Sequence, residues 1–218
     1  MSLMQSYTYG PASGSDPKKI VLMLHGVGSN GQDLIGLAPY LASSLPNTVF
    51  VSADAPEAYD MAPMGFQWFS LQNYVPEFLV GGMDKALPVV NEYIDRLLSH
   101  YSLQESDLAL LGFSQGTMMA LHIAPRRKKP LAGVLGYSGM LLNGEALKED
   151  GMNKVPVCLV HGEADDVVPV AGFPEAKRHL ESAGFPFEGE TIPGLAHSID
   201  DRGMELGAQF LQKILGDR

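Results

Sequence analysis

The sequence predicts one domain of the α/β class, with a central, mostly parallel sheet and helices on both faces. Short apolar runs rich in branched residues alternate with longer stretches that carry apolar residues at helical spacing. This alternation is typical of strands joined by crossover helices. No linker-like stretch, low-complexity tract or internal repeat divides the 218 residues, so we expect a single domain over 1–218.

The individual elements follow from local pattern. The expected strands are short, apolar and bounded by turn formers, as buried parallel strands are. They are 20–24, 49–52, 108–112, 134–137, 157–160 and 187–192. The expected helices, which carry apolar residues on one face, are 34–45, 83–100, 115–124, 170–182 and 202–215. Residues 59–82 are rich in Met, aromatic and Gly residues and follow neither period, which predicts a loop or mixed excursion.

Composition excludes several partners. A formal net charge of -10 argues against nucleic acid or an anionic membrane, since both attract a positive surface. The sequence has no signal-peptide pattern at its start and no run of about 18 apolar residues that could span a bilayer, so we expect a cytoplasmic chain. The only cysteine, Cys158, lies in an apolar run and is expected to be a core thiol. We expect no cofactor.

A candidate nucleophile stands between an expected strand and an expected helix. Gly112-Phe113-Ser114-Gln115-Gly116 fits the G-x-S-x-G elbow, whose serine is exposed on a strained strand-to-helix turn. Larger side chains at 112 and 116 would collide across so tight a turn. We therefore expect Ser114 to stand above the sheet.

A serine hydroxyl needs a base, and the base needs an orienting acid. Asp165 and Asp166 follow the strand expected at 157–160, and His197 follows the last expected strand. The order Ser, Asp, His is that of this type of elbow hydrolase, and either aspartate could be the acid.

A glycine-rich turn, 25–31, follows the first strong strand. Its spacing fits neither G-x-G-x-x-G nor the P-loop, which disfavours nucleotide binding. An oxyanion hole is the better interpretation: the backbone N–H of Val27 would join that of Gln115 to stabilise the charge of a tetrahedral intermediate.

These four blocks together resemble the carboxylesterase/phospholipase family of α/β-hydrolases, which includes the acyl-protein thioesterases. The similarity extends over nearly the whole chain and implies an α/β-hydrolase fold without a separate cap domain. It implies Ser114 as nucleophile, Asp165 as acid, His197 as base, and Val27 and Gln115 as oxyanion donors. Asp165 is preferred because it holds the family's position two residues before Val167.

The sequence also departs from the family's pattern. Asp166 stands where proline is common, and Thr117 stands where many members have glycine. Trp68-Phe69-Ser70 resembles a W-F-D segment near the family's substrate groove, with serine replacing the acid. The resemblance therefore implies substrate contacts from Trp68, Phe69 and the nearby Leu71. We expect the apolar residues of 59–82 to form a partly exposed acyl-binding wall or lid, with ordinary core as the alternative.

The other histidines have simpler explanations. His25 and His161 each precede a glycine at a strand end and are expected to bond loop backbone. His100, His122 and His179 lie in helical patterns without partners at metal-ligand spacing, so no metal is expected.

The expected function is that of a serine carboxylesterase acting on short- to medium-chain esters through an acyl-enzyme. The substrate would be a small-molecule ester or thioester. An acyl-protein thioesterase or lysophospholipase would use the same residues, and the same acyl-enzyme could pass its acyl group to an alcohol or peroxide. The alternative of another class is a non-catalytic binding protein on a hydrolase fold. A homodimer is left open.

Overall fold

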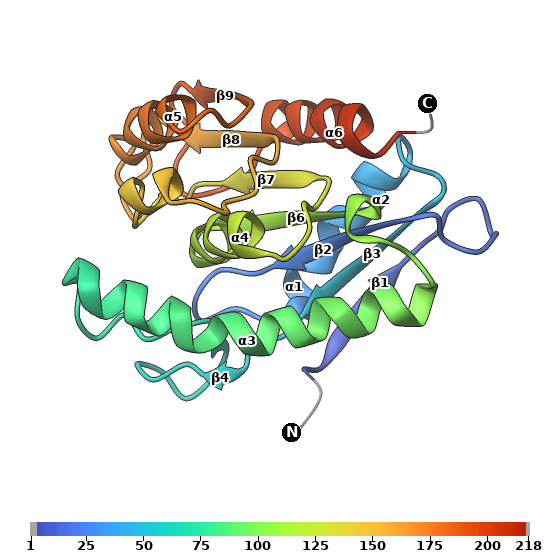
Figure 1. The fold of residues 1–218 in the computed structure, drawn as a ribbon, viewed down its shortest axis with the longest axis horizontal. Coiled ribbons are helices and arrows are strands. Elements are labelled where there is room, and N and C mark those ends of the chain that lie inside the picture. Colours follow the sequence, from blue (N-terminus) through green and yellow to red (C-terminus); the bar gives the residue numbers. More distant parts are fainter. Residues whose placement is uncertain (1–3, 217–218) are drawn as a thin grey trace.

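A seven-stranded sheet forms the centre of the protein (Figure 1). The computed structural model describes residues 4–216. The strands of the sheet, in spatial order, are β1 (Ser6–Tyr9), β3 (Thr48–Ala53), β2 (Lys19–Leu24), β6 (Leu108–Phe113), β7 (Gly133–Tyr137), β8 (Val157–Gly162) and β9 (Phe187–Ile192). All neighbours are parallel except β1, which runs antiparallel to β3. The predicted mostly parallel α/β architecture is confirmed.

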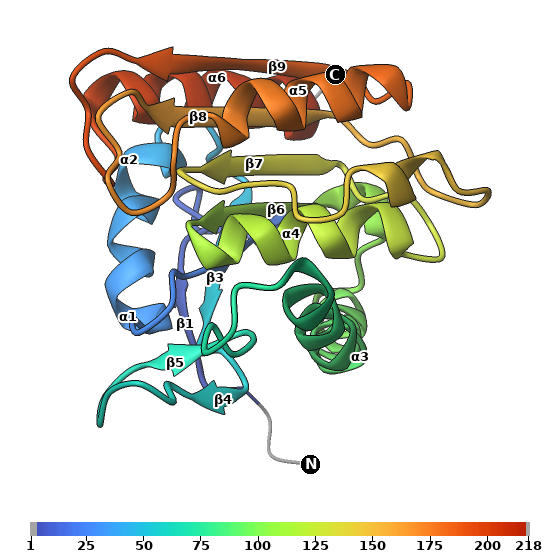
Figure 2. The ribbon, with the colours of Figure 1, turned by 90° about the vertical axis from the view of Figure 1, so that its left-hand side faces the viewer.

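Helices cover both faces of the sheet, as Figures 1 and 2 show. They are α1 (Gly31–Leu34), α2 (Ala38–Ala42), α3 (Pro76–Tyr101), α4 (Gln115–Arg126), α5 (Gly172–Ser182) and α6 (Asp201–Leu215). Short 3-10 turns lie at Ile35–Leu37, Glu105–Asp107 and Glu145–Lys148. One core cluster joins the sheet to α3, α4 and α5, and the other joins it to α1, α2 and α6.

The central strands are apolar on both sides because both faces are covered. In β2, Ile20 and Leu22 enter the core beneath α3 and α4, whereas Val21 and Met23 enter the core beneath α2 and α6. The sequence of this strand is therefore a continuous apolar run and does not alternate between apolar and polar residues.

The prediction of one helix over 34–45 is wrong. The structure has α1, a 3-10 turn at Ile35–Leu37, and then α2. Pro39 lies in the first turn of α2. Because proline has no backbone N–H, it cannot donate to the carbonyl of Ile35, and a continuous α-helix loses a bond there.

The segment 59–82 is mixed, as expected, and contains part of a long helix. A small hairpin of β4 (Glu57–Ala58) and β5 (Phe66–Gln67) lies outside the main sheet. Helix α3 begins at Pro76 rather than at the predicted residue 83. Gly81 and Gly82 are poor helix formers, so the sequence pattern did not indicate the first turns of this helix. A Cβ on Gly82 would lie 2.9 Å from the Cβ of Phe69, so the second glycine permits a close approach.

Candidate active site

The turn between β6 and α4 holds Ser114 in a strained conformation. Its φ of 54° and ψ of −118° are outside the regions that non-glycine residues normally adopt. The N–H of Ser114 donates to the carbonyl of Tyr137 in β7 at 2.9 Å. Strain of this kind persists only where the surrounding structure enforces it, and it is common at functional sites.

The two glycines of the elbow are required for different steric reasons. A Cβ at Gly112 would lie 2.4 Å from the backbone nitrogen of Thr117, across the turn, as predicted. A Cβ at Gly116 would lie 1.8 Å from the carbonyl oxygen of Leu24. Gly116 therefore allows α4 to start against the end of β2, a contact with a neighbouring strand that the local sequence does not reveal.

Thr117, the residue after the elbow motif, ties the elbow to β7. Its hydroxyl donates to the carbonyl of Tyr137 at 2.8 Å and accepts from the N–H of the same residue at 3.0 Å. The carbonyl of Tyr137 thus accepts from both Ser114 and Thr117. The buried hydroxyl of Thr117 therefore has both a donor and an acceptor on β7.

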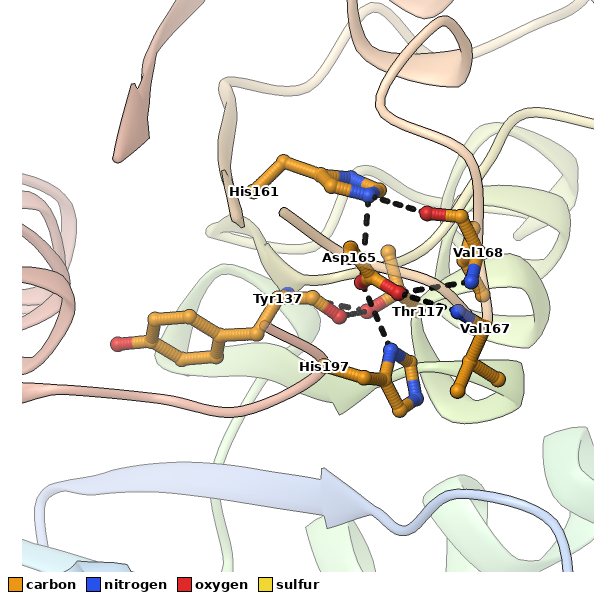
Figure 3. A network of polar contacts seen from close by, with 7 residues as sticks. All are labelled: Thr117, Tyr137, His161, Asp165, Val167, Val168 and His197. Atoms are coloured by element: carbon orange, nitrogen blue, oxygen red, sulfur yellow. Dashed lines mark hydrogen bonds and ion pairs between the residues drawn. The ribbon is translucent and has the colours of Figure 1, made fainter. Parts of the chain in front are cut away.

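Asp165, which is buried, and His197, which is half-buried, form a pair at the carboxyl end of the sheet (Figure 3). The Nδ1 atom of His197 lies 2.8 Å from Oδ2 of Asp165, while Oδ1 accepts from the N–H groups of Val167 and Val168 at 2.9 and 2.8 Å. Burial raises the pKa of Asp165, but the bonds from His197, Val168 and Val167 outweigh it and hold this pKa below its usual value. Of the two aspartates considered, Asp165 is the partner of His197, and Asp166 is exposed.

His161 lies on the other side of Asp165 from His197 (Figure 3). Its Nε2 donates to the carbonyl of Val168 at 2.9 Å and lies 3.4 Å from Oδ2 of Asp165. It bonds loop backbone, as predicted, and this bond supports the loop that carries the acid.

Ser114 and His197 line one open cavity of about 490 Å³. The ring of Phe113, inside the elbow motif, lies 4.9 Å from the imidazole of His197 between ring centres. The apolar residues of the cavity lining are Val27, Leu34, Leu37, Phe113, Val167 and Ile199. The sequence analysis did not single out Phe113 or the residues of α1 and the following turn, since their apolar pattern is also that of ordinary core.

Of the two predicted oxyanion donors, one lines this cavity and the other lies next to Ser114 in the chain. Val27 is part of its lining, and Gln115 follows Ser114 as the first residue of α4. The first N–H groups of a helix have no partner within the helix, and they stabilise negative charge. Within residues 4–216, neither the N–H of Val27 nor that of Gln115 has a protein acceptor.

The predicted substrate-contact residues do not line the cavity. Trp68 and Phe69 are each 1% exposed and belong to the core, and Leu71 is half-buried against it. The expected apolar wall is divided between core and surface. Its exposed members are Met61, Met64, Tyr74, Val75 and Phe78.

Several other residues are separate from this site. Burial raises the pKa of the Cys158 thiol to about 12, so it is a core thiol and a poor nucleophile at neutral pH. No group of three or more His, Cys, Asp or Glu among residues 4–216 is arranged to bind a metal ion. In the same range, no helix is both long and apolar enough to cross a membrane.

Comparisons with known proteins agree with this geometry. A family model described as Phospholipase/Carboxylesterase matches residues 11–215. Acyl-protein thioesterase 1 of Kluyveromyces lactis is 30% identical over 94% of this chain and 96% of its own length. Esterase YpfH of Escherichia coli is 27% identical over 89% of this chain and 82% of its own.

The crystal structure of esterase PE8 superimposes with a TM-score of 0.92, at 34% identity, over 98% of this chain and all of the other. The predicted α/β-hydrolase fold is therefore confirmed. On the matched blocks and the fold together, the chain belongs to the phospholipase/carboxylesterase family.

Proposed function

We propose that this protein is a serine carboxylesterase that hydrolyses short- to medium-chain esters through an acyl-enzyme intermediate. One observation carries the proposal: a strained, positive-φ Ser114 and the Asp165-bonded His197 line the same cavity. Esterases among its relatives support the same class of reaction.

In the first half of the reaction, Oγ of Ser114 adds to the ester carbonyl while Nε2 of His197 takes its proton. Because Nδ1 of His197 donates to Asp165, the neutral ring has its lone pair on Nε2, where the proton must arrive. The carbonyl oxygen becomes an oxyanion beside the N–H groups of Val27 and Gln115. When the tetrahedral intermediate collapses, the alcohol leaves with the proton from His197.

In the second half, water replaces the alcohol. His197 takes a proton from water as the water attacks the acyl-enzyme, and it returns this proton to Ser114 as the carboxylic acid leaves. Both halves use the same base and the same oxyanion donors, so the loss of either set slows the whole cycle.

The size of the cavity supports short to medium acyl groups. It is open, has a volume of about 490 Å³, and is bounded by the side chains of Leu34, Leu37, Val167 and Ile199. Trp68 and Phe69 add nothing to its wall, because both are buried. The accessible apolar surface therefore lies close to Ser114.

Thioester hydrolysis is the second candidate. The 30% identity with an acyl-protein thioesterase over nearly the full length of both chains favours it, and the same three side chains would perform it. A lysophospholipase would also use them. Comparing nitrophenyl esters of increasing acyl length with acyl thioesters of matching length separates these activities. If the protein prefers long acyl thioesters, thioester hydrolysis becomes the first candidate in place of the hydrolysis of short- to medium-chain esters.

The nucleophile is tested with 4-nitrophenyl butyrate and a fluorophosphonate probe. Ser114→Ala should lower kcat/KM by a factor of about 10⁴ or more and abolish labelling, because among residues 4–216 no other positive-φ serine lines the cavity. Ser138→Ala is the matched control. Ser138 also has a positive φ, follows the neighbouring strand β7 and is buried, and its hydroxyl has no hydrogen-bond partner within residues 4–216.

The control should keep labelling and turnover close to the wild type. If wild type neither labels nor hydrolyses these esters, a binding role on a hydrolase fold replaces the enzyme hypothesis. If Ser114→Ala still labels, another residue is the nucleophile.

A further inference from the structure

The direction of the Val27 N–H is decided by the carbonyl of the preceding residue. The carbonyl of Gly26 and the N–H of Val27 belong to one planar, trans peptide group, in which the two bonds point in opposite directions. Whatever holds the Gly26 carbonyl on one side therefore aims the Val27 N–H to the other. Val27 and Gly26 both lie at the cavity that contains Ser114.

The Gly26 carbonyl is held by the ring of His25. Nδ1 of this ring lies 2.7 Å from the Gly26 oxygen, and Nε2 accepts from the N–H of Ala55 at 3.0 Å. Both contacts require the same tautomer, a neutral imidazole with its proton on Nδ1. Burial lowers the pKa of His25, which favours this neutral form.

Trp68 connects His25 to the other side of the site. Its indole N–H donates to the carbonyl of His25 at 2.9 Å, and its backbone N–H donates to Oε1 of Gln115 at 2.9 Å. The side-chain amide of Gln115 also donates to the carbonyl of Phe69 at 2.7 Å. A buried chain of hydrogen bonds thus runs from His25 through Trp68 to Gln115, the residue that follows Ser114.

We propose that His25, Trp68 and the side chain of Gln115 are positioning residues that fix the Val27 N–H relative to the Gln115 N–H, and so set the geometry of the oxyanion hole. In this role each of the three side chains acts through the backbone groups that it bonds. This gives Trp68 a role different from the substrate contact that the family resemblance implied. The inference rests on the proposed esterase function.

Two isosteric variants of His25 separate its two contacts. The amide nitrogen of Asn occupies nearly the position of Nδ1, so His25→Asn keeps a donor for the Gly26 carbonyl and loses the acceptor for Ala55. The amide of Gln reaches the position of Nε2, so His25→Gln keeps the acceptor for Ala55 and leaves the Gly26 carbonyl without its donor. Each variant buries one amide and loses one backbone contact, which makes them matched controls for stability.

If His25 aims the Val27 N–H, the two variants differ in kcat. His25→Gln should lower kcat for 4-nitrophenyl butyrate by about 10²-fold, the order expected when an oxyanion donor is lost or misplaced, with KM within about threefold of wild type. His25→Asn should stay within about tenfold of wild type. The inhibition constant of an aryl trifluoromethyl ketone, whose adduct places an oxyanion in the hole, should rise in parallel with the loss of kcat.

The outcomes are distinguishable from a failure of the proposed function. Equal losses of kcat in both variants, or an unchanged inhibition constant in His25→Gln, would overturn the positioning role while wild-type turnover and Ser114 labelling stand. Absence of wild-type turnover would overturn the function itself. If either His25 variant fails to fold, Trp68→Phe removes the indole N–H alone and should also lower kcat and weaken the ketone without a matching change in KM. A Trp68→Phe protein with wild-type values for both would contradict the inference.

Discussion

At the scale of single residues, Asp165 makes more contacts than a simple acid–base pair requires. Oδ2 faces His197, and Oδ1 accepts two backbone N–H groups. In Asp165→Asn, the side-chain oxygen should stay with the two N–H donors, which turns the amide NH₂ toward Nδ1 of His197. His197 must then accept at Nδ1 and carry its proton on Nε2, so it cannot take the proton of Ser114. We expect kcat to fall by about 10³- to 10⁴-fold, measured with 4-nitrophenyl butyrate.

Asp166→Asn is the control for this substitution, because it makes the same chemical change one residue along the chain. Asp166 is exposed, and its side chain has no hydrogen bond to His197 within residues 4–216. Its activity should remain near that of wild type. A large loss of kcat in Asp166→Asn together with a small one in Asp165→Asn would reverse the assignment of the acid.

The placement of the candidate site residues was predictable where the motif itself enforces geometry, while their catalytic roles stay a prediction. Strand, tight turn and helix placed Ser114, and the order of strands brought Asp165 and His197 to the same edge of the sheet. The burial of Trp68 was not predictable in this way. Its backbone N–H bonds to the side-chain amide of Gln115, far away in sequence, and an aperiodic segment contains no signal of which side chains point inward.

At the scale of elements, the start of α4 depends on its contact with the end of β2. Gly116→Ala should distort the elbow, because its Cβ would lie 1.8 Å from the Leu24 carbonyl oxygen, and backbone atoms on both sides would have to move. We expect loss of fluorophosphonate labelling and a large fall in stability, of about 3 kcal/mol or more, measured by urea unfolding.

Gly81→Ala gives the matched control in another helix. Gly81 lies inside α3, and an added Cβ would meet no atom within 4 Å. Alanine there should leave activity unchanged and raise the free energy of unfolding by about 0.5–1 kcal/mol, the usual gain over glycine in a helix. If Gly116→Ala changes activity and stability no more than Gly81→Ala does, the elbow does not require the absence of a side chain at Gly116.

The central strands were predictable from their continuous apolar runs, and β9, which is mostly half-buried, was also predicted at its observed bounds, Phe187–Ile192. β2, β3, β6 and β8 have continuous apolar runs because helices cover both of their faces. β1 was missed because it is a mostly exposed edge strand whose residues are polar or aromatic, and only its antiparallel pairing with β3 makes it a strand. Packing across elements, which decides such cases, is absent from any local pattern.

At the scale of the whole molecule, buried neutral histidines link stability to pH. His122 in α4 lies 2.9 Å from Asp84 in α3. Burial, followed by the charge of Arg126, lowers the pKa of His122 to about 4, against the opposing effect of Asp84. The unfolded chain therefore takes up this proton at a higher pH than the folded one. Stability should be unaffected above pH about 6.5 and should fall steadily as the pH drops from there toward 4.

His122→Gln keeps a donor for Asp84 and removes the titration. Between pH 7 and pH 4.5, the loss of unfolding free energy should be smaller in this variant than in wild type by about 2 kcal/mol, measured by urea unfolding at both values. Some loss should remain, because burial also lowers the pKa of His25. Asp165 affects stability only at lower pH. Its pKa in the folded protein is depressed, so the stability that its charged form contributes is lost as the pH falls through this depressed pKa. The control is His100→Gln, because His100 lies on the exposed side of α3, and this variant should lose as much unfolding free energy as wild type. If His122→Gln also loses as much as wild type, the contact between α3 and α4 tolerates a charged imidazole.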